Sequence, residues 1–569
     1  MKTSSQQTMP LWRLLLVFVL LALLFAFLVA RVVALQVMDD GFLQGQGDAR
    51  TLRMQTVPAY RGVISDRSGE PLAVSTPVAS IWINPKQMLS LDQDYRPLAK
   101  LLALSTKDIV AKINDNQRRG FIYLRRHIEP KIAKQVKQLN LIGVGVQQEY
   151  KRFYPAAEVA SHIVGFTNID DRGQEGIELA YDEWLRGRSG SKRVIKDLHG
   201  HVIRELDQPK EAVSGNNLAL SIDMRLQYMA YKELKASLQK TRAKAGSVVV
   251  LDVKTGEILA MVNQPSYNPN NRSTLNPAHM RNRALTDVFE PGSTVKPFTV
   301  LAALESGKYS AHTKIDTSPG YIRVGRKTLL DPVNYGEIDV TKVLTKSSQV
   351  GTSKIALNLD EQSIWEMFSR VGFGRDVGSG FPGESAGLLP NRINWRPIER
   401  VNFAFGYGLS VTPVQLAQAY SVLANEGRLQ PLSLLRQETI PKARQIVDPA
   451  LAKQLVSMLQ TVTEEGGTGT NAQVANYHVA GKTGTVHKVG KSGYADDRYR
   501  AVFAGMAPVG KPRMVVVVMI DEPKNDKYYG GEVAAPIFSK VMSDALRLMN
   551  VSPDNRNTVS ADKATRTLS

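Results

Sequence analysis

The sequence contains no cysteine among its 569 residues. Without thiols it forms no disulfide, has no thiolate nucleophile and ligates no metal or iron–sulfur cluster through cysteine. It also lacks a Gly-rich phosphate-binding loop, an internal repeat and a second apolar run as long as the one near its start. These absences remove several classes of nucleotide-binding, repeat and multi-span membrane protein.

The composition is that of a folded chain with an excess of positive charge. Hydrophobic residues make up 43% and charged residues 22%, which excludes a disordered or collagen-like protein. Lys and Arg number 72 against 53 Asp and Glu, a formal net charge of +19. This balance suits an anionic partner, such as nucleic acid, anionic lipid or an acidic polymer.

One long apolar run lies near the start of the chain. Residues 14–30 carry no charge, and counting through Leu35 gives about 33 Å of helix at ~1.5 Å per residue. Arg31 can snorkel towards the headgroups. A cleaved signal peptide is the alternative, but the run exceeds the usual ~7–15 residues and no A-x-A site follows it. We therefore predict a membrane anchor over 14–36.

The charges that flank the anchor predict its orientation. Basic residues precede it and acidic residues follow it: Lys2 and Arg13, then Asp39 and Asp40. The positive-inside rule then places residues 1–13 in the cytoplasm and the rest outside. An external body argues against DNA or RNA as the partner, despite the net charge.

The remainder divides into two regions and a tail. Residues 37–215 mix short β-like pieces with charged helical stretches and hold no compact set of reactive residues. We interpret them as a non-catalytic pedestal. A turn-forming SGNN precedes a second domain over 216–549. Residues 550–569 have almost no apolar content and are expected to be a disordered tail.

The second domain has the pattern of an α+β fold. SVVVLDV, KTGE and ILAMV predict a hairpin, and the doubly apolar RMVVVVMID predicts a central strand. Asp223 can cap one amphipathic helix, and a second covers 535–549. Residues 290–465 are mostly helical by pattern. Strands from both ends of a domain with helices between them indicate an antiparallel sheet flanked by helices, plus a helical subdomain.

One of four S-x-x-K tetrapeptides stands apart from the others. Ser293 follows Glu-Pro-Gly and opens an apolar helix that ends at Gly307, so Ser293 and Lys296 share a face at its first turn. The Ser293 N–H is one of the unpaired donors at the helix start, where the dipole favours developing negative charge. Of the other three serines, Ser189 lies in a basic loop, Ser237 lies late in a predicted helix and Ser560 lies in the tail.

Two further motifs follow in chain order. Lys482-Thr483-Gly484-Thr485 reads as a strand, whereas the K-T-G at Lys254 forms the tip of the predicted hairpin and reads as a turn. Ser347-Ser348-Gln349 lies between Ser293 and Lys482, at the start of another helical stretch.

This motif order resembles the penicillin-binding proteins and serine β-lactamases, in which S-x-x-K, S-x-N and K-T-G occur in sequence. The stretches that carry the resemblance cover nearly the whole chain: RGVISDRSGEPLAVS, YKRFYP, GQEGIELAYDEWLRG, FEPGSTVKPFTVLAALESG, AFGYGLSVTPVQLAQAYSVLANEG, EEGGTGTNAQVANYHVAGKTGT and YYGGEVAAPIF. They are most similar to class B penicillin-binding proteins, and among these to division-specific transpeptidases of the FtsI type.

The resemblance implies roles for eight residues and no metal or organic cofactor. Ser293 would attack the penultimate D-Ala of a stem peptide with Lys296 as its base, Ser347 would relay protons, and Lys482 would act electrostatically. Thr483, Gly484 and Thr485 would bind substrate on the strand, with Gln349 opposite. The N–H groups of Ser293 and Thr485 would form the oxyanion hole.

The proposed base must be neutral at physiological pH. A free lysine has a pKa near ~10.4, so a shift of ~3 units is needed. Burial together with the charge of Lys482 can supply it.

Gln349 departs from the family pattern, which has Asn there. The extra methylene moves the amide by roughly 1.5 Å, and displacements near 1 Å can cost ~10²-fold in a preorganised site. Either Gln bends back and makes the same bonds, or this is a paralogue with altered acylation.

Taken together, the sequence predicts a membrane-anchored serine D,D-transpeptidase of septal peptidoglycan synthesis. Expected ligands are stem peptides ending in D-Ala-D-Ala and β-lactams; expected partners are an FtsW-type glycan polymerase and other division proteins. The alternatives are an elongation-type or conditional paralogue, a β-lactamase, and a division scaffold. The expected location is the bacterial inner membrane, with the catalytic domain in the periplasm.

Overall fold

The chain forms two compact units, each built from non-consecutive segments. The computed structural model describes residues 11–35, 52–89, 91–196, 202–273, 275–490, 493–524 and 527–555. The first unit comprises residues 1–60, 77–150 and 187–214, and the second comprises 61–76, 151–186 and 215–569. Residues 61–76 and 151–186, which the sequence assigns to the pedestal, thus belong to the second unit. Most of the expected tails, 1–13 and 550–569, lies outside the described residues.

The first unit begins with helix α1 (Leu11–Val33), which starts three residues before the anchor predicted over 14–36. Its large apolar side chains are exposed. Its 23 residues span about 34 Å at ~1.5 Å each, which matches the hydrocarbon core of a bilayer. Within the described part of the chain, it is the one helix long and apolar enough to cross a membrane.

The rest of the first unit is a mixed α/β module. Strands β1, β8 and β9 form one antiparallel sheet, and the end of β3 pairs with β4 over a small apolar core. Its elements are β1 (Leu52–Val57), α3 (Pro85–Met88), α4 (Arg96–Leu102), α5 (Thr106–Asp115), β4 (Ile122–Ile128), α6 (Pro130–Gln138), β8 (Gly190–Lys196) and β9 (Val202–Lys210). Strands β3 (Pro71–Ile83) and β5 (Val144–Phe153) run through both units.

A five-stranded antiparallel sheet organises the second unit. Its strand order is β12-β11-β21-β20-β19. The bounds are β11 (Ala245–Asp252), β12 (Ile258–Gln264), β19 (Ala480–Gly490), β20 (Gly493–Ala507) and β21 (Met514–Asp521). The predicted hairpin is β11–β12, with Lys254 in its turn. The predicted central strand is β21, which is buried on both faces. Strand β19, with the second K-T-G, is an edge strand.

Helices cover both faces of this sheet. Helices α10 (Met224–Thr241) and α21 (Ala535–Leu548) pack on one face, around a core rich in Val and Ala. As predicted, the Asp223 carboxylate caps α10, accepting hydrogen bonds from the N–H groups of Arg225 and Leu226. Helix α18 (Pro413–Ala424), buried along its whole length, packs on the other face. The predicted α+β class is confirmed.

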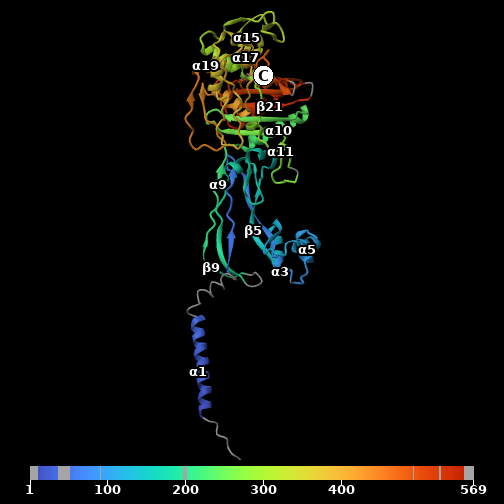
Figure 1. Ribbon diagram of the computed structural model, residues 1–569. Coiled ribbons are helices and arrows are strands. Elements are labelled where there is room, and N and C mark those ends of the chain that lie inside the picture. The colour runs from blue at the N-terminus through green and yellow to red at the C-terminus, as the bar shows by residue number, and fades with distance from the viewer. Residues whose placement is uncertain are drawn as a thin grey trace, which may run out of the picture. The chain divides into compact units, whose positions relative to one another are not determined.

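Helices are the main regular elements of residues 290–465, but they cover fewer than half of these residues, fewer than the sequence analysis expects. The helices are α13 (Lys296–Glu305), α14 (Val340–Thr345), α15 (Gln349–Asn358), α16 (Ser363–Arg370), α17 (Pro397–Ala404), α18 and α19 (Pro449–Gln460). Helices α15, α17 and α19 lie beyond β21 in Figure 1. Three short ribbons interrupt the helices: β13 (Lys314–Asp316) with β16 (Glu337–Asp339), β14 (Tyr321–Val324) with β15 (Lys327–Leu330), and β17 (Arg428–Leu429) with β18 (Arg444–Gln445). The sequence analysis did not predict these ribbons.

A buried charge cluster joins three of the sequence stretches that carry the family resemblance. Glu178, in α8 (Gly176–Ala180), accepts hydrogen bonds from Arg61 Nε at 2.7 Å and Arg152 Nε at 2.6 Å. All three side chains are at most 1% exposed. Arg61 also pairs with Asp182. The RGVISDR, YKRFYP and GQEGIEL stretches therefore meet in the second unit.

Candidate active site

Ser293 lies on a tight turn ahead of a buried helix. Residues Gly292–Val295 form a 3₁₀ turn, and the α-helix begins only at Lys296, three residues later than the sequence analysis predicts. In a 3₁₀ turn the side chains at i and i+3 eclipse, so Ser293 and Lys296 project on the same side. Ser293 is partly exposed, whereas Lys296 is fully buried.

The Ser293 turn is fixed against strand β19. Gly292 has φ +55°, and a Cβ there would lie 2.3 Å from Val486 Cγ2. A Cβ on Gly484 would lie 2.8 Å from Thr294 Cγ2. Both glycines are thus required for the strand and the turn to approach this closely. The Tyr420 hydroxyl, on α18, donates a hydrogen bond to the Thr294 carbonyl oxygen at 2.8 Å.

Lys296 has the environment of a neutral amine. Its Nζ donates to the carbonyl oxygen of Ser347 at 2.6 Å, and Ser347 Oγ lies 3.2 Å away. The Phe405 ring centroid is 5.7 Å from Nζ. Burial lowers the pKa of Lys296 to about 7, although the Asp331 carboxylate acts in the opposite direction. Burial is therefore the main cause of the shift, rather than the charge of Lys482.

Ser347 occupies a strained backbone conformation between α14 and α15. Its φ is +57°, in the left-handed region that residues with a side chain rarely adopt. Such a conformation costs on the order of 1–3 kcal/mol and persists only where the surroundings enforce it. Here both the carbonyl oxygen and the hydroxyl of Ser347 come within hydrogen-bonding reach of Lys296 Nζ.

Asp331 enforces this turn, and the sequence analysis did not identify it. Its buried carboxylate accepts hydrogen bonds from Ser348 Oγ at 2.6 Å, from Gln349 N at 2.5 Å and from Val350 N at 3.2 Å. It therefore serves as a second cap for α15, whose N-cap is Ser348. Asp331 follows the unpredicted β14–β15 ribbon, and only an Asp-Pro pair in a loop marks it in the sequence.

Gln349 is the first residue of α15, and its side chain is exposed. Its backbone N–H is held by Asp331, and its carbonyl oxygen accepts from Ser353 Oγ at 2.7 Å. Among the residues the structure describes, its side-chain amide has no hydrogen-bond partner. The amide is thus available to a ligand, as the S-x-N position requires.

Lys482 is the second buried amine of the site. Its Nζ lies 3.4 Å from both the carbonyl oxygen and the Oγ1 of Thr483. Burial, and then repulsion from Lys296, lower the pKa of Lys482. Two ammonium groups at these positions would repel each other in a medium of low dielectric, so both cannot be charged at little cost.

Thr485 has a defined hydroxyl orientation. Its Oγ1 accepts a hydrogen bond from the N–H of Gly530 at 2.9 Å. With that lone pair engaged, the hydroxyl proton is available to a carboxylate. Thr483 Oγ1 instead lies 2.9 Å from Thr468 Oγ1. Because β19 is an edge strand, its outer backbone groups are available to an extended ligand.

Three tyrosine rings, two of which directly precede Gly530 in the chain, form a stack. Tyr528 stacks on Tyr499 with ring centroids 4.3 Å apart and on Tyr529 at 4.5 Å. Tyr529 is 55% exposed. His487, just past the K-T-G, packs against Tyr499 with ring centroids 4.6 Å apart.

The structure brings some predicted residues into direct contact and others only into proximity. Lys296 and Ser347 are hydrogen-bonded, Lys482 is close enough to Lys296 for repulsion to lower its pKa, and β19 packs on the Ser293 turn. The described residues include no hydrogen bond between Ser293 Oγ and Lys296. Candidate catalytic contacts are often long without substrate and tighten on binding. Within the described ranges, no group of three or more His, Asp or Glu side chains can hold a metal.

Two family matches cover most of the chain. Residues 246–543 match the penicillin binding protein transpeptidase domain, and residues 56–220 match the penicillin-binding protein dimerisation domain. The chain belongs to the penicillin-binding proteins. The transpeptidase match contains all eight candidate site residues, and the dimerisation match contains the Arg61–Glu178–Arg152 cluster.

Curated penicillin-binding proteins extend the match to almost the full length. The chain is 45% identical to the "Probable peptidoglycan D,D-transpeptidase PbpC" of Pseudomonas aeruginosa, over 96% of each chain. It is 42% identical to the peptidoglycan D,D-transpeptidase FtsI of Escherichia coli, over 95% of this chain and 93% of the relative. A solved transpeptidase domain of Burkholderia pseudomallei penicillin-binding protein 3 is 41% identical, with a TM-score of 0.55, over 59% of this chain and 97% of that one.

Proposed function

We propose that this penicillin-binding protein is a serine D,D-transpeptidase that cross-links peptidoglycan stem peptides through an acyl-enzyme on Ser293. The observation that carries the proposal is the buried Lys296 amine. It has a pKa near 7, bonds to Ser347 and lies on the same side of a 3₁₀ turn as the Ser293 hydroxyl. The names of the relatives support the substrate class.

The first half-reaction transfers the acyl group to the enzyme. Ser293 Oγ attacks the carbonyl carbon of the penultimate D-Ala while its proton passes to neutral Lys296. The N–H groups of Ser293 and Thr485 stabilise the oxyanion, typically by ~3–4 kcal/mol per donor. The C–N bond then breaks, and the departing D-Ala nitrogen takes a proton through Ser347. Thr485 holds the terminal carboxylate, with Lys482, Thr483, Gly484 and Gln349 completing the substrate contacts.

The second half-reaction releases the cross-linked product. The amine of a neighbouring stem peptide attacks the ester carbonyl of acyl-Ser293 and loses its proton to the basic site. The ester C–O bond breaks, and Ser293 Oγ regains a proton. β-Lactams would acylate the same hydroxyl, because their ring amide occupies the place of the scissile bond.

We further propose that the enzyme acts at the division septum. The full-length similarity to FtsI supports this role, together with an N-terminal anchor that would place the catalytic unit in the periplasm. A glycan polymerase of the FtsW type would then supply the strands, since the matched domains include no glycosyltransferase. The similarity to PbpC keeps a conditional paralogue as the alternative.

Mass spectrometry of the penicillin-treated protein tests the mechanism. The label should map to the Ser293 peptide and persist for hours, and Ser293→Ala should abolish it without changing the melting temperature. Loss of the label within seconds would identify a β-lactamase instead. Full complementation of a depletion strain by Ser293→Ala would identify a scaffold. In such a strain, filaments support the septal role and round cells contradict it.

A further inference from the structure

A cavity of about 280 Å³ lies in the second unit, away from the Ser293 turn. The end of α16 and the loop after it form one wall. The ribbon of β17 (Arg428–Leu429) and β18 (Arg444–Gln445), with the loop between its strands, forms the other. Helix α18 forms the floor. Its volume is close to the lower end of ordinary ligand sites, about 300–1,000 Å³, and suits a single sugar or a dipeptide.

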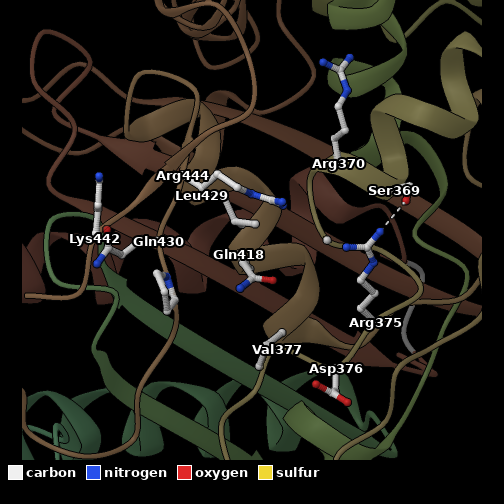
Figure 2. Close-up of a pocket in the computed structure, with 12 residues that line it drawn as sticks. Ser369, Arg370, Arg375, Asp376, Val377, Gln418, Leu429, Gln430, Lys442 and Arg444 are labelled. Carbon is white, nitrogen blue, oxygen red and sulfur yellow. Dashed lines mark hydrogen bonds between the residues drawn. The ribbon is translucent and has the colours of Figure 1, made fainter.

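The floor of this cavity contains the amide of a glutamine. Gln418, on α18, is 6% exposed and borders the cavity (Figure 2). Within the described residues, its side-chain amide has no hydrogen-bond partner. The residue is largely buried, but its amide atoms are open to the cavity and can bond to a ligand or to solvent there. Tyr420, two positions further along the helix, instead binds Thr294 beside the nucleophile, so the cavity and the active site lie against different sides of α18.

Positive charge surrounds the amide. Figure 2 shows the guanidinium groups of Arg375 and Arg444 extending towards each other, and Lys442 lines the same cavity as Gln418. Arg375 has a long contact, 3.4 Å, with Ser369 Oγ. Lys442 and Arg444 have no side-chain hydrogen bond or ion pair among the residues that the structure describes.

The other two charged residues that line the cavity do not neutralise the positive charge of Arg375, Lys442 and Arg444. Arg370 is paired with Glu305 and points away from the cavity. The Asp376 carboxylate also points away from Arg375 and Arg444 in this view. Val377 and Leu429 add apolar surface between the polar groups. Convergent cations, a polar floor and apolar walls are the features of a site for a small anionic molecule.

We propose that this cavity binds a small organic anion, whose carboxylate or phosphate group is held by Arg375 and Arg444 and whose polar body contacts Gln418. Guanidinium groups bind both anionic groups in a bidentate manner, which is why the two chemistries share one site. No catalytic step is involved, and the site is independent of acylation at Ser293.

Isothermal titration calorimetry of the full-length protein in detergent tests this proposal with three probes. Inorganic phosphate represents the phosphate group, citrate the carboxylate, and N-acetylmuramic acid a sugar that carries a carboxylate. At least one probe should bind saturably, and the probe that binds identifies the preferred anionic group. Arg375→Gln/Arg444→Gln should weaken this binding at least tenfold, and Gln418→Leu severalfold without a change in charge.

The matched control is Arg96→Gln/Arg547→Gln, which removes two exposed cations outside the cavity. It should leave binding unchanged, and all variants should be acylated by penicillin at the wild-type rate. The proposal is overturned if no probe binds saturably, if the control weakens binding as much as the cavity variant, or if Gln418→Leu has no effect. Because the probes need no acylation, these outcomes are distinct from failure of the proposed function.

Discussion

Lys296 Nζ and the carbonyl oxygen of Ser347, 51 positions apart in the chain, are joined by a hydrogen bond of 2.6 Å. A carbonyl oxygen only accepts, so one N–H of the amine is committed to it in either protonation state. Ser347 Oγ, 3.2 Å away, can accept from the amine or donate to it. Under the proposed mechanism, Lys296 can therefore accept the proton of Ser293, and Ser347 can pass a proton to the departing nitrogen.

The rate of penicillin acylation should rise with pH through neutrality. The reactive form has neutral Lys296, whose pKa is about 7, so the second-order rate constant should be half-maximal near pH 7. Below that point it should fall about tenfold per pH unit, as a single protonation requires. Stopped-flow fluorescence with a labelled penicillin measures this between pH 5.5 and 8.5. A flat profile in protein that remains folded would show that Lys296 is not the base.

Asp331→Asn should slow acylation and shift its pH profile downwards. The variant keeps the size of the side chain but disturbs the hydrogen bonds that hold the Ser347–Gln349 turn, and misplacement by about 1 Å can cost ~10²-fold. It also removes the negative charge that raises the pKa of Lys296, so the half-maximal pH should fall below 7. The measurement is the same stopped-flow series.

The control for Asp331 is Asp360→Asn, which removes an 83% exposed carboxylate paired with Lys308. Its rate and pH profile should match those of the unmodified protein. A slower Asp331→Asn enzyme with an unshifted profile would mean that Asp331 only shapes the turn. An unchanged rate would remove its positioning role altogether.

Local patterns in the sequence account for the sheet and its helices but only partly for the site. The run of valines in β21 predicts a strand buried on both faces, and Asp223 marks the start of α10, because both signals are local. The left-handed Ser347 and the contact of Asp331 with α15 are not predictable in this way. They depend on a ribbon of four-residue strands, β14–β15, that has little apolar alternation, and on tertiary packing that no motif records.

The order of the three motifs identified the candidate catalytic residues because few residue types can act as nucleophile and base. An amine that acts as a base must be buried, and the sequence places Lys296 at the start of an apolar helix, which is buried from Lys296 to Leu304. The sequence analysis named burial and the charge of Lys482 as causes of the shifted pKa of Lys296, and burial is the main one.

Gln349→Asn should raise the rate of penicillin acylation severalfold. The amide of Gln349 is exposed and unbound within the described part of the structure, so a ligand must immobilise it. Gln loses more rotamer freedom than the shorter Asn, by roughly 0.5–1 kcal/mol, which corresponds to about two- to fivefold. Stopped-flow acylation of the two proteins compares them directly. Identical rates would show that the extra methylene has no kinetic consequence.

Glu178→Gln should destabilise the protein strongly without touching the active site. Glu178 is the shared acceptor of Arg61 and Arg152, and all three side chains are buried. Removing its charge leaves Arg152 without its counter-ion and Arg61 with Asp182 alone, and breaking a buried pair typically costs about 3–5 kcal/mol. Urea or thermal unfolding, followed by circular dichroism, measures the loss. Asp360→Asn, at an exposed pair, should change stability by less than about 1 kcal/mol.

The acylation rate of folded Glu178→Gln distinguishes a purely structural role of this cluster from a role in positioning the catalytic turn. Glu178 has no contact with Ser293, Lys296 or Ser347 among its described hydrogen bonds, so at low temperature the variant should be acylated at nearly the normal rate. Equal stability of Glu178→Gln and the unmodified protein would contradict a structural role. A stable but slowly acylated variant would instead indicate that the cluster positions the catalytic turn from a distance.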